Sequence, residues 1–293
     1  MGRSPQPLAD TRDDDASPAQ THHSHMSLLD VRDVSMRYPQ RGGGSLAVLD
    51  DVSLTVGDGE LVALIGPSGC GKSTLLAILA GLEAPTAGSV AVRGDRDARR
   101  LGRFGYMPQR DLLLPWRSAL GNAAAGLEAQ GVRRAEARER ARAVFGEFGL
   151  AGFERAYPPQ LSGGMRQRVA FARTVLAGGE LLLLDEPFGA LDALTRASLQ
   201  RWLLDLWERL ERTCLLVTHD VDEALLLADR VYALSPRPGR VLLERAVSLP
   251  RPRPREQLLA PEVQALRLEL LTALEAADQD ATFATATPEG GSQ

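Results

Sequence analysis

The stretch "GPSGCGKST" at residues 66–74 constrains the fold of this chain more than any other. It fits the pattern G-x-x-x-x-G-K-[ST], whose glycines allow a loop with backbone N–H groups that point inward at phosphate oxygens. The preceding "ELVALIG" (60–66) is an apolar run of the buried-strand type, and "KSTLLAILAGL" (72–82) spaces its apolar residues as a helix does, from Leu75 to Leu82. The order strand, loop, helix therefore predicts a phosphate-binding loop at a helix N-terminus. A chance glycine-rich turn is the alternative.

Lys72 is the only lysine in a chain with 34 lysines and arginines. Since arginine occupies every other basic position, Lys72 is expected where the compact ammonium fits and the planar guanidinium does not. The motif predicts that Lys72 bridges the outer phosphates of a nucleotide and that Ser73 ligates Mg2+. The residues expected to bind the nucleotide here are Gly66, Pro67, Ser68, Gly69, Cys70, Gly71, Lys72, Ser73 and Thr74.

Two further apolar runs end in polar residues. The run "LLLLD" ends in Asp185, which is followed by Glu186, and "TCLLVTHD" (213–220) contains His219. A carboxylate at a strand end beside a phosphate loop can hold Mg2+, and a second can polarise a water for attack on a γ-phosphate. A strand that ends in ordinary polar residues is the alternative. Residues that follow three strand ends in this way are typical of an open α/β sheet.

The remaining pattern predicts the other elements. Strand-like segments at 28–34, 47–56 and 88–94 indicate an antiparallel layer, and the charge-dense segment 133–150 indicates a helix with a mostly solvated face. Residues 229–248 read as two strands joined by a Pro-Gly turn, and a final helix begins near Pro261. Disorder is expected over 1–26 and from Asp278 on. We interpret the histidines of that leader as part of a mobile tail rather than as a metal site; they are His22, His23 and His25.

Composition excludes some classes of function. With 44% hydrophobic residues and a net charge of −4, the chain can build a substantial core and has no general attraction for nucleic acid. It has no apolar run of membrane-spanning length and no signal-like N-terminus, which predicts a protein of the cytoplasm. Cys70 and Cys214 are expected to be reduced thiols. Cys70 is either a somewhat acidic thiol among N–H donors or simply a small residue that fits.

The stretch "LSGGMRQRVAFAR" (161–173) indicates a second anion-binding helix start. Ser162 can cap the helix, and Gly163 and Gly164 leave N–H groups open. One nucleotide needs only one such loop. The second therefore makes sense if it faces the nucleotide of another copy of the chain.

With these motifs in place, the chain resembles the nucleotide-binding subunit of an ATP-binding cassette (ABC) transporter from roughly Leu28 to Leu249. "LSGGMRQR" is similar to the family signature, "LLLLDEP" to its Walker B motif and "ALD" (190–192) to its D-loop. The resemblance implies an α/β fold, a P-loop NTPase ABC cassette with a RecA-like parallel sheet core, an antiparallel β layer and an α-helical subdomain. The expected divisions are a leader at 1–26, the ATP-binding domain at 27–250 with its helical subdomain at about 110–175, and a C-terminal helix and tail at 251–293.

The resemblance also implies a mechanism. Two copies form a head-to-tail homodimer, and each ATP lies between the phosphate loop of one copy and Ser162, Gly163 and Gly164 of the other. Glu186 activates water, His219 contacts the γ-phosphate, Gln109 senses metal and water, Asp192 links the two sites, and Tyr38 stacks on adenine. The implied Mg2+ residues are Ser73, Gln109 and Asp185.

The implied partners are integral membrane permease subunits and a periplasmic or lipoprotein solute-binding protein, with the chain peripheral to the cytoplasmic face of the inner membrane. A soluble ABC protein of translation or DNA repair is an alternative, but such proteins carry two cassettes or a long coiled-coil insertion. A P-loop kinase or GTPase would leave "LSGGMRQR" and His219 unexplained.

The segment after Gln109 bears on the cargo. Leu112 to Trp116 form an apolar, proline-stiffened stretch, which either docks a partner or packs locally, with local packing less favoured for Trp116. In ABC transporters this region receives a short coupling helix of the membrane subunit. "LLPW" and "SPRPGRV" (235–241) are similar to importers of nitrate, taurine and aliphatic sulfonates. Import of such a solute is expected, with other small molecules such as thiamine precursors as the rival.

Overall fold

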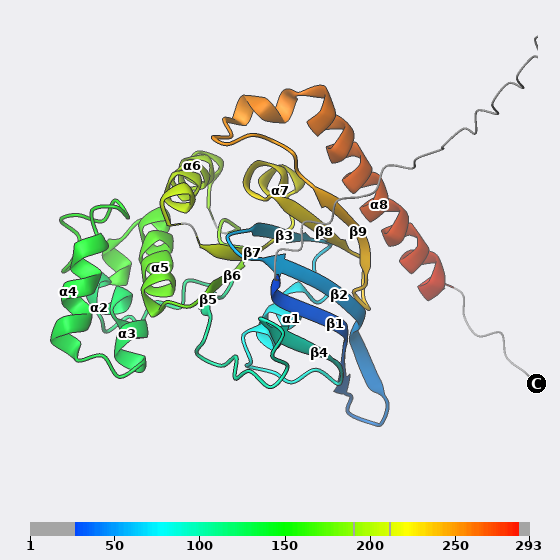
Figure 1. Ribbon diagram of the computed structural model, residues 1–293, viewed down its shortest axis with the longest axis horizontal. Coiled ribbons are helices and arrows are strands. Elements are labelled where there is room, and N and C mark those ends of the chain that lie inside the picture. Colours follow the sequence, from blue (N-terminus) through cyan, green and yellow to red (C-terminus); the bar gives the residue numbers. More distant parts are fainter. Residues whose placement is uncertain (1–26, 190, 211, 287–293) are drawn as a thin grey trace, which may run out of the picture.

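The computed structural model describes residues 27–286 except Ala190 and Glu211. The predicted leader, its three histidines and the first residue of the D-loop stretch lie outside the described residues. In the described part, six strands form a central sheet in the order β5-β6-β7-β3-β8-β9 (Figure 1). Its strands are β5 Gly105–Met107, β6 Leu181–Asp185, β7 Thr213–Thr218, β3 Leu61–Ile65, β8 Arg230–Leu234 and β9 Val241–Ala246.

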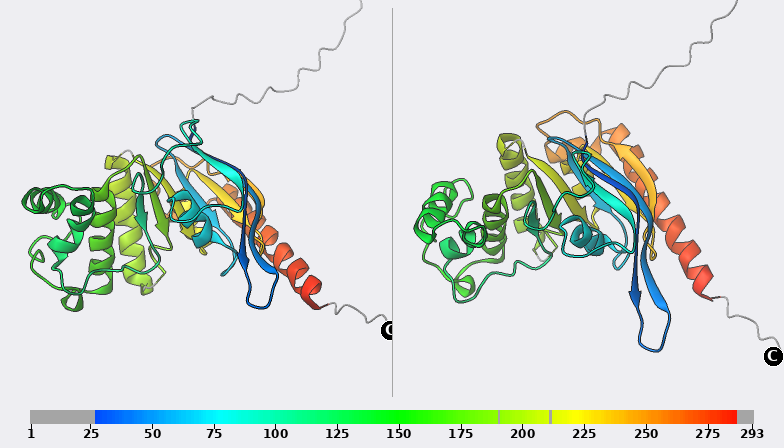
Figure 2. Two further views of the ribbon diagram at one scale, coloured as in Figure 1. Left: turned by 90° about the horizontal axis from the view of Figure 1, so that it is seen from below. Right: turned by 60° about the horizontal axis from the view of Figure 1, so that its bottom comes forward.

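The central sheet is parallel from β5 to β8, and only β9 runs antiparallel to its neighbour. A second sheet, antiparallel throughout and in the order β2-β1-β4, forms a separate layer (Figure 2). Its strands are β1 Ser27–Pro39, β2 Ser45–Gly57 and β4 Ala87–Val92. The sequence-based expectation of a parallel core with an antiparallel β layer is confirmed, although β1 and β2 extend beyond the predicted ends as a long hairpin.

Alternate residues of the central strands belong to two different cores. Leu61, Ala63 and Ile65 of β3 pack with the helices on one face, whereas Val62 and Leu64 pack with α1 and the antiparallel layer on the other. The two-residue period of a strand produces this division, and it explains why these strands are apolar throughout.

Helices cover both faces of the central sheet. Figure 1 shows α2, α3 and α4 grouped at one end of the molecule, with α5 between them and the sheet. The helices are α1 Lys72–Leu79, α2 Ala119–Ala123, α3 Ala125–Ala129, α4 Arg134–Val144, α5 Gly163–Ala177, α6 Ala193–Leu210, α7 Val221–Leu227 and α8 Pro261–Ala286; 3-10 turns span Pro158–Gln160 and Arg255–Leu259.

Three sequence expectations about helices need correction. Helix α1 ends at Leu79, so Leu82 lies beyond its apolar face and is 54% exposed. The charge-dense helix α4 ends at Val144, and the residues that follow turn inward, with Phe145 and Phe148 buried. Helix α8 continues past Asp278 to Ala286, where disorder had been expected. Within the described residues, no helix combines the length and apolarity needed to cross a membrane.

Candidate active site

The phosphate loop connects β3 to α1, as the sequence predicts. Gly69 and Gly71 have φ values of 79° and 109°, in the left-handed region that favours glycine. A Cβ on Gly71 would also lie 2.6 Å from a methyl group of Leu49. The loop therefore curves tightly around the start of α1 and packs against β2.

The Lys72 side chain lies inside this curve and is 5% exposed. Its Nζ donates to the carbonyl oxygens of Gly66 at 2.8 Å and Pro67 at 2.9 Å. The two bonds direct a compact ammonium into the space that the loop encloses. A planar guanidinium with its five donors has a different shape and would not make the same pair of contacts.

A cavity of about 510 Å3 opens over the loop, which is the size of a small-molecule site. One wall is the phosphate loop and the other is the antiparallel layer, so the cavity joins the two sheets. Its lining residues are Tyr38, Leu46, Val48, Ser68, Gly69, Gly71, Lys72, Ser73, Thr74, Gln109, Glu186 and Arg237.

Sequence reasoning missed three of these lining residues. Leu46 and Val48 belong to β2; the sequence assigns Val48 only to the antiparallel layer, and Leu46 lies just before the strand predicted at 47–56. Arg237 lies in the stretch 235–241, which had been noted solely as a mark of a transporter branch. Its neighbouring Pro-Gly turn gave no sign that the guanidinium would reach the phosphate loop.

Tyr38 is the penultimate residue of β1 and lines this cavity. Its hydroxyl donates to the carboxylate of Glu83, and partial burial together with that contact raises the pKa of Tyr38. The ring is thus anchored at its hydroxyl end on the same side of the cavity as Leu46 and Val48. An aromatic ring held beside two aliphatic side chains is suited to pack against the flat face of a nucleotide base.

Asp185 and Ser73 have the properties of a magnesium site. Asp185 is 3% exposed, its Oδ1 has no hydrogen-bond partner among the described residues, and burial raises the pKa of its carboxyl. The nearby Ser73 side chain opposes this rise in the pKa of Asp185. A buried carboxylate with an unused oxygen beside a hydroxyl suits Mg2+, a hard cation that commonly takes one or two protein oxygens and completes its shell with phosphate and water.

The three predicted catalytic residues meet at one atom. Oε2 of Glu186 accepts a hydrogen bond from Nε2 of Gln109 at 3.1 Å and lies 3.2 Å from Nδ1 of His219. The three residues follow β5, β6 and β7, whose carboxyl ends lie at the same edge of the sheet. Glu186 has a φ of 43°, which is uncommon for a residue with a side chain and turns the chain sharply at the end of β6.

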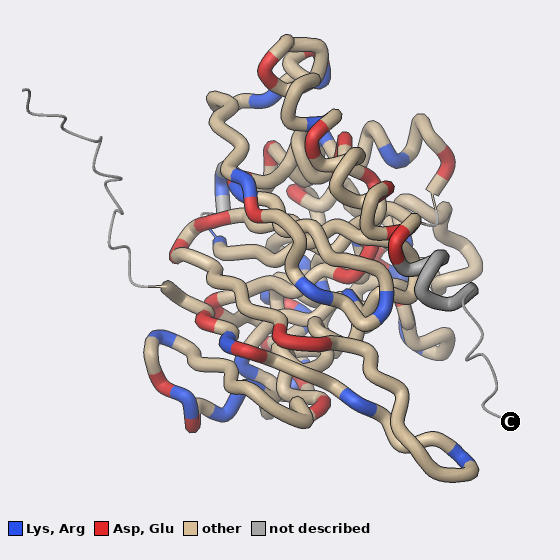
Figure 3. The backbone as a smooth tube through the Cα atoms, turned by 90° about the vertical axis from the view of Figure 1, so that its right-hand side faces the viewer, with Lys and Arg blue, Asp and Glu red and all other residues tan. Residues whose placement is uncertain are grey.

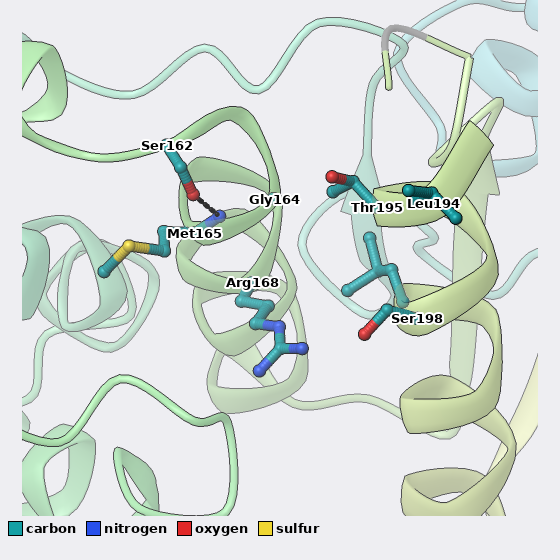
Figure 4. Close-up of a pocket in the computed structure, with 8 residues that line it drawn as sticks. Ser162, Gly164, Met165, Arg168, Leu194, Thr195 and Ser198 are labelled. Atoms are coloured by element: carbon teal, nitrogen blue, oxygen red, sulfur yellow. Dashed lines mark hydrogen bonds between the residues drawn. The ribbon is translucent and has the colours of Figure 1, made fainter. Parts of the chain in front are cut away.

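The signature residues lie apart from this cavity. Ser162 caps α5, since its Oγ accepts from the backbone N–H of Met165 at 3.2 Å. It lines a second cavity of about 460 Å3 between α5 and α6, together with Gly164, Arg168, Thr195 and others (Figure 4). The two cavities share no lining residue. Within one chain, the structure therefore does not bring the signature residues to the phosphate loop.

Gly163 and Asp192 lie next to the second cavity. A Cβ on Gly163 would lie 3.4 Å from Leu191, and one on Gly164 would lie 2.8 Å from Thr195, so α5 and α6 approach closely here. Oδ1 of Asp192 accepts from the N–H of Thr195 at 3.0 Å, which lowers the pKa of Asp192 and caps α6.

The interpretation of Cys70 as an acidic thiol is wrong. Cys70 is buried, and desolvation raises the pKa of its thiol despite the nearby Lys72. Its Sγ lies against Gly66, where an added Cβ would be 3.0 Å away. The alternative, a small residue that fits the loop, agrees with the structure. Cys214 is also a free buried thiol, and burial raises its pKa further above the usual range.

The segment after Gln109 presents two apolar side chains to the surface. Trp116 is 72% exposed and Leu112 is 58% exposed, whereas Leu113 packs against the core. Asn122 of α2 is buried and holds the turn: its amide donates to three carbonyl oxygens, those of Leu114, Arg117 and Ser118, and its Oδ1 accepts from the N–H of Leu114. Trp116 is thus exposed on a turn whose backbone is held by hydrogen bonds to Asn122.

Comparisons with known proteins match most of this chain to one family. The profile of the ABC transporter family matches residues 49–189. A taurine import ATP-binding protein of Burkholderia pseudomallei is 47% identical over 226 residues, which cover 77% of this chain and 86% of that protein. A formylaminopyrimidine import ATP-binding protein of Halalkalibacterium halodurans is 46% identical over 211 residues, covering 72% of this chain and 81% of that protein.

Solved structures agree as well. A dimeric ATP-binding cassette in a post-hydrolysis state, bound to ADP and phosphate, superposes with a TM-score of 0.66 at 31% identity. The match covers 75% of this chain and 99% of that structure.

Proposed function

The chain belongs to the ABC transporter family as an ATP-hydrolysing subunit, and from this premise we propose that it energises the import of a small solute through a separate membrane permease. The solute is taurine, an aliphatic sulfonate or nitrate. The permease subunits and a solute-binding protein outside the membrane complete the system, with this chain peripheral to the cytoplasmic face of the membrane.

The residues of the first cavity have these proposed roles. Lys72 and the inward N–H groups of the phosphate loop bind the outer phosphates, and Tyr38 stacks on the base. Ser73 and Asp185 hold Mg2+. Gln109 lines the same cavity as Ser73 and is the third residue proposed for the metal. When bound, Mg2+ neutralises charge that develops on the transferred phosphoryl group. Glu186 takes the proton of the attacking water, and His219 and Gln109 orient that carboxylate.

The second cavity indicates how two copies assemble. Ser162 and Gly164 line a hollow at the start of α5, and among the described residues none of the phosphate loop lines it. In a head-to-tail dimer this helix start faces the nucleotide held by the other copy, where its free N–H groups stabilise negative charge. Asp192, beside both Thr195 and the cavity, would then lie at the subunit boundary.

One observation favours transport over a purely soluble role, namely the exposed apolar pair Leu112 and Trp116 on a segment tied to the active site. Arg173 of α5 donates to the carbonyl oxygens of Asp111 at 2.6 Å and Leu112 at 2.9 Å, and Arg166 pairs with Asp111 at 3.3 Å. The segment is thus fastened to the signature helix at one end and follows Gln109 directly. A short helix of the permease that rests on Trp116 would therefore be coupled to movement of the signature helix α5 and of Gln109.

The cargo assignment draws on the relatives and on two stretches of sequence. One relative, at 47% identity, is a taurine import protein, and another, at 46%, is a formylaminopyrimidine import protein. The cargo does not touch this subunit. Sequence similarity therefore supports the kind of permease with which the chain pairs, and it does not identify a cargo-binding site in the chain itself. A formylaminopyrimidine, a precursor of thiamine, is therefore the second candidate.

The test is growth of a deletion strain on defined sources. We expect it to fail on taurine or a sulfonate as the only sulfur source, or on nitrate as the only nitrogen source, and to recover when the gene is returned. Normal growth under all three conditions would contradict the taurine, sulfonate or nitrate cargo. A growth requirement relieved only by thiamine would favour the formylaminopyrimidine assignment.

A further inference from the structure

The loop between β8 and β9, residues 235–240, has a firm internal structure. Oγ of Ser235 donates to the carbonyl oxygen of Pro238 at 3.0 Å and accepts from the N–H of Arg240 at 2.9 Å. The N–H of Ser235 donates to the carbonyl oxygen of Arg240 at 2.9 Å, which closes the loop. A loop closed by these bonds can support a neighbouring segment.

The same loop is joined to β2, one wall of the nucleotide cavity. The N–H of Gly239 donates to Val48 O at 2.9 Å, and the N–H of Asp50 donates to Gly239 O at 3.0 Å. Nε of Arg240 also donates to Asp50 Oδ2 at 3.0 Å. These contacts fix the distance between the loop and the strand that carries Leu46 and Val48.

On its other side the loop contacts the backbone of the phosphate loop. Nε and Nη2 of Arg237 both donate to the carbonyl oxygen of Gly69, at 3.1 and 3.0 Å. Gly239 packs closely against the backbone of Cys70, since a Cβ added to Gly239 would lie 2.3 Å from the carbonyl oxygen of Cys70. The loop therefore connects the two walls of the cavity, which Arg237 itself lines.

The contact with Gly69 determines how one peptide unit of the phosphate loop is oriented. In a trans peptide the C=O and the following N–H point in opposite directions. Holding the Gly69 carbonyl toward Arg237 thus directs the N–H of Cys70 to the opposite side, where it donates to Pro67 O at 3.3 Å. Gly69 has a φ of 79°, and glycine tolerates several backbone orientations, so this peptide unit would rotate easily without an outside donor.

We propose that Arg237 is a positioning residue, which holds the phosphate loop in its phosphate-binding form before nucleotide arrives. Both donors of the guanidinium edge meet a single carbonyl, so the side chain restrains the Gly69–Cys70 peptide against rotation. Preorganisation of this kind strengthens binding because less ordering remains to occur when the ligand binds. The β-phosphate, which ADP and ATP share, is the group that such a loop cradles.

The test compares Arg237→Gln and Arg237→Lys with Arg240→Gln as the matched control. Arg240 is an exposed arginine of the same loop, with its own carboxylate partner, and makes no contact with Gly69 among the described residues. Dissociation constants for ADP and ATP are measured by calorimetry, with kcat and KM for ATP hydrolysis alongside and a thermal unfolding curve for each variant.

We expect Arg237→Gln to raise Kd for ADP and for ATP by the same factor, about three- to tenfold for a lost pair of hydrogen bonds. KM should rise in parallel while kcat at saturating ATP stays the same. Arg237→Lys, which keeps one donor, should fall between wild type and Arg237→Gln. Arg240→Gln should leave both dissociation constants unchanged even where it lowers the unfolding temperature.

Three outcomes would overturn the proposal. Unchanged nucleotide affinity in Arg237→Gln would show that the loop needs no such restraint. A much larger loss for ATP than for ADP would mean that the guanidinium, which also lines the cavity, contacts the terminal phosphate directly. An equal loss in Arg240→Gln would assign the effect to general support by the loop. If Arg237→Gln fails to fold, wild-type dissociation constants for ADP and ATP in Arg237→Lys would equally overturn the proposal.

Discussion

Nδ1 of His219 lies 3.2 Å from Oε2 of Glu186, and the same oxygen accepts from Gln109. The side chain of Glu186 is mostly buried, whereas that of His219 is about half exposed, so the carboxylate is the fixed member of the pair and the imidazole the one with room to move. Glu186 also lines the nucleotide cavity, where a water can reach its carboxylate. The geometry thus gives Glu186 two partners that orient this carboxylate.

Replacing Glu186 by Gln should separate binding from hydrolysis. The amide keeps the size of the side chain and one oxygen for Gln109, but it cannot take a proton from water. We expect Glu186→Gln to bind ATP and to hydrolyse it roughly 100-fold more slowly or worse. The closed dimer should accumulate, which size-exclusion chromatography with and without ATP measures.

The double variant Lys72→Ala/Glu186→Gln is the control for this experiment, since it should neither bind ATP tightly nor dimerise. A Glu186→Gln chain that stays monomeric at ATP concentrations far above its Kd would contradict the head-to-tail assembly.

Both Lys72→Ala and Lys72→Arg should lose ATP binding. Alanine removes the two bonds that Nζ makes to Gly66 and Pro67, and the guanidinium does not fit the space that a 5% exposed ammonium occupies. Loss of a charge-assisted contact to phosphate corresponds to about 10- to 100-fold in affinity. Titration with a fluorescent ATP analogue checks this, and wild-type affinity in Lys72→Arg would refute the size argument.

Trp116→Ala should weaken association with the permease and leave the isolated ATPase unchanged. A tryptophan 72% exposed on an ordered turn has the character of an interface anchor, and truncating such a residue costs 2 kcal/mol or more, about 30-fold in affinity. Co-purification with the membrane subunit, together with growth on the solute, measures the effect.

Leu259→Ala is the matched control for Trp116→Ala. Leu259 is equally exposed but lies in the 3-10 turn Arg255–Leu259, outside the segment that follows Gln109. Full rescue of growth by Trp116→Ala, or an equal defect in Leu259→Ala, would contradict docking at Trp116.

The buried carboxylate of Glu223 predicts a pH effect on stability. Glu223 of α7 accepts from Thr218 Oγ1 at 2.6 Å and from Gln200 Nε2 at 2.8 Å, which joins α6 to the end of β7. Burial raises the pKa of Glu223 above its ordinary value of 4.5, and nearby Asp220 adds to the rise, while Thr218, Gln200 and Arg196 oppose it.

Because the pKa of Glu223 is higher in the folded chain, folding favours its protonated form. This contribution to the free energy of unfolding is fully present below pH 4.5 and is lost as the pH rises through the folded-state pKa, by up to about 1.4 kcal/mol per pH unit. Glu223→Gln has no such proton to lose, so that part of the pH dependence should vanish. Urea unfolding at several pH values measures it, with the exposed Glu275→Gln as control; identical profiles for Glu223→Gln and wild type would refute the assignment.

Much of the nucleotide site could be predicted because its parts are local in sequence. The phosphate loop, the acidic end of β6 and the cap at Ser162 each depend on a few consecutive residues whose conformation is set by glycine, by a strand end or by a helix start. The roles assigned to Glu186, His219, Gln109 and Asp192 remain predictions, although the first three share one place in the structure.

What escaped prediction depends on contacts between distant segments. Arg237 reaches Gly69 across 168 positions, and no periodicity reports such a pairing. The inward turn after Val144 is decided by packing rather than by helix propensity. The desolvation of Cys70 could not be foreseen either, since the loop's N–H groups are visible in the sequence but its burial is not.

The solitary, enclosed ammonium of Lys72 also makes the chain unusual toward amine-modifying chemistry. Apart from the N-terminal amine, an acylating or aldehyde reagent has a single primary amine to modify, and that amine lies at the bottom of the nucleotide cavity. Mass spectrometry of the peptide that contains residue 72 would then report occupancy of the site directly, because bound nucleotide shields the one reactive nitrogen. A labelling experiment that needs engineered residues in most proteins is available here in the native sequence.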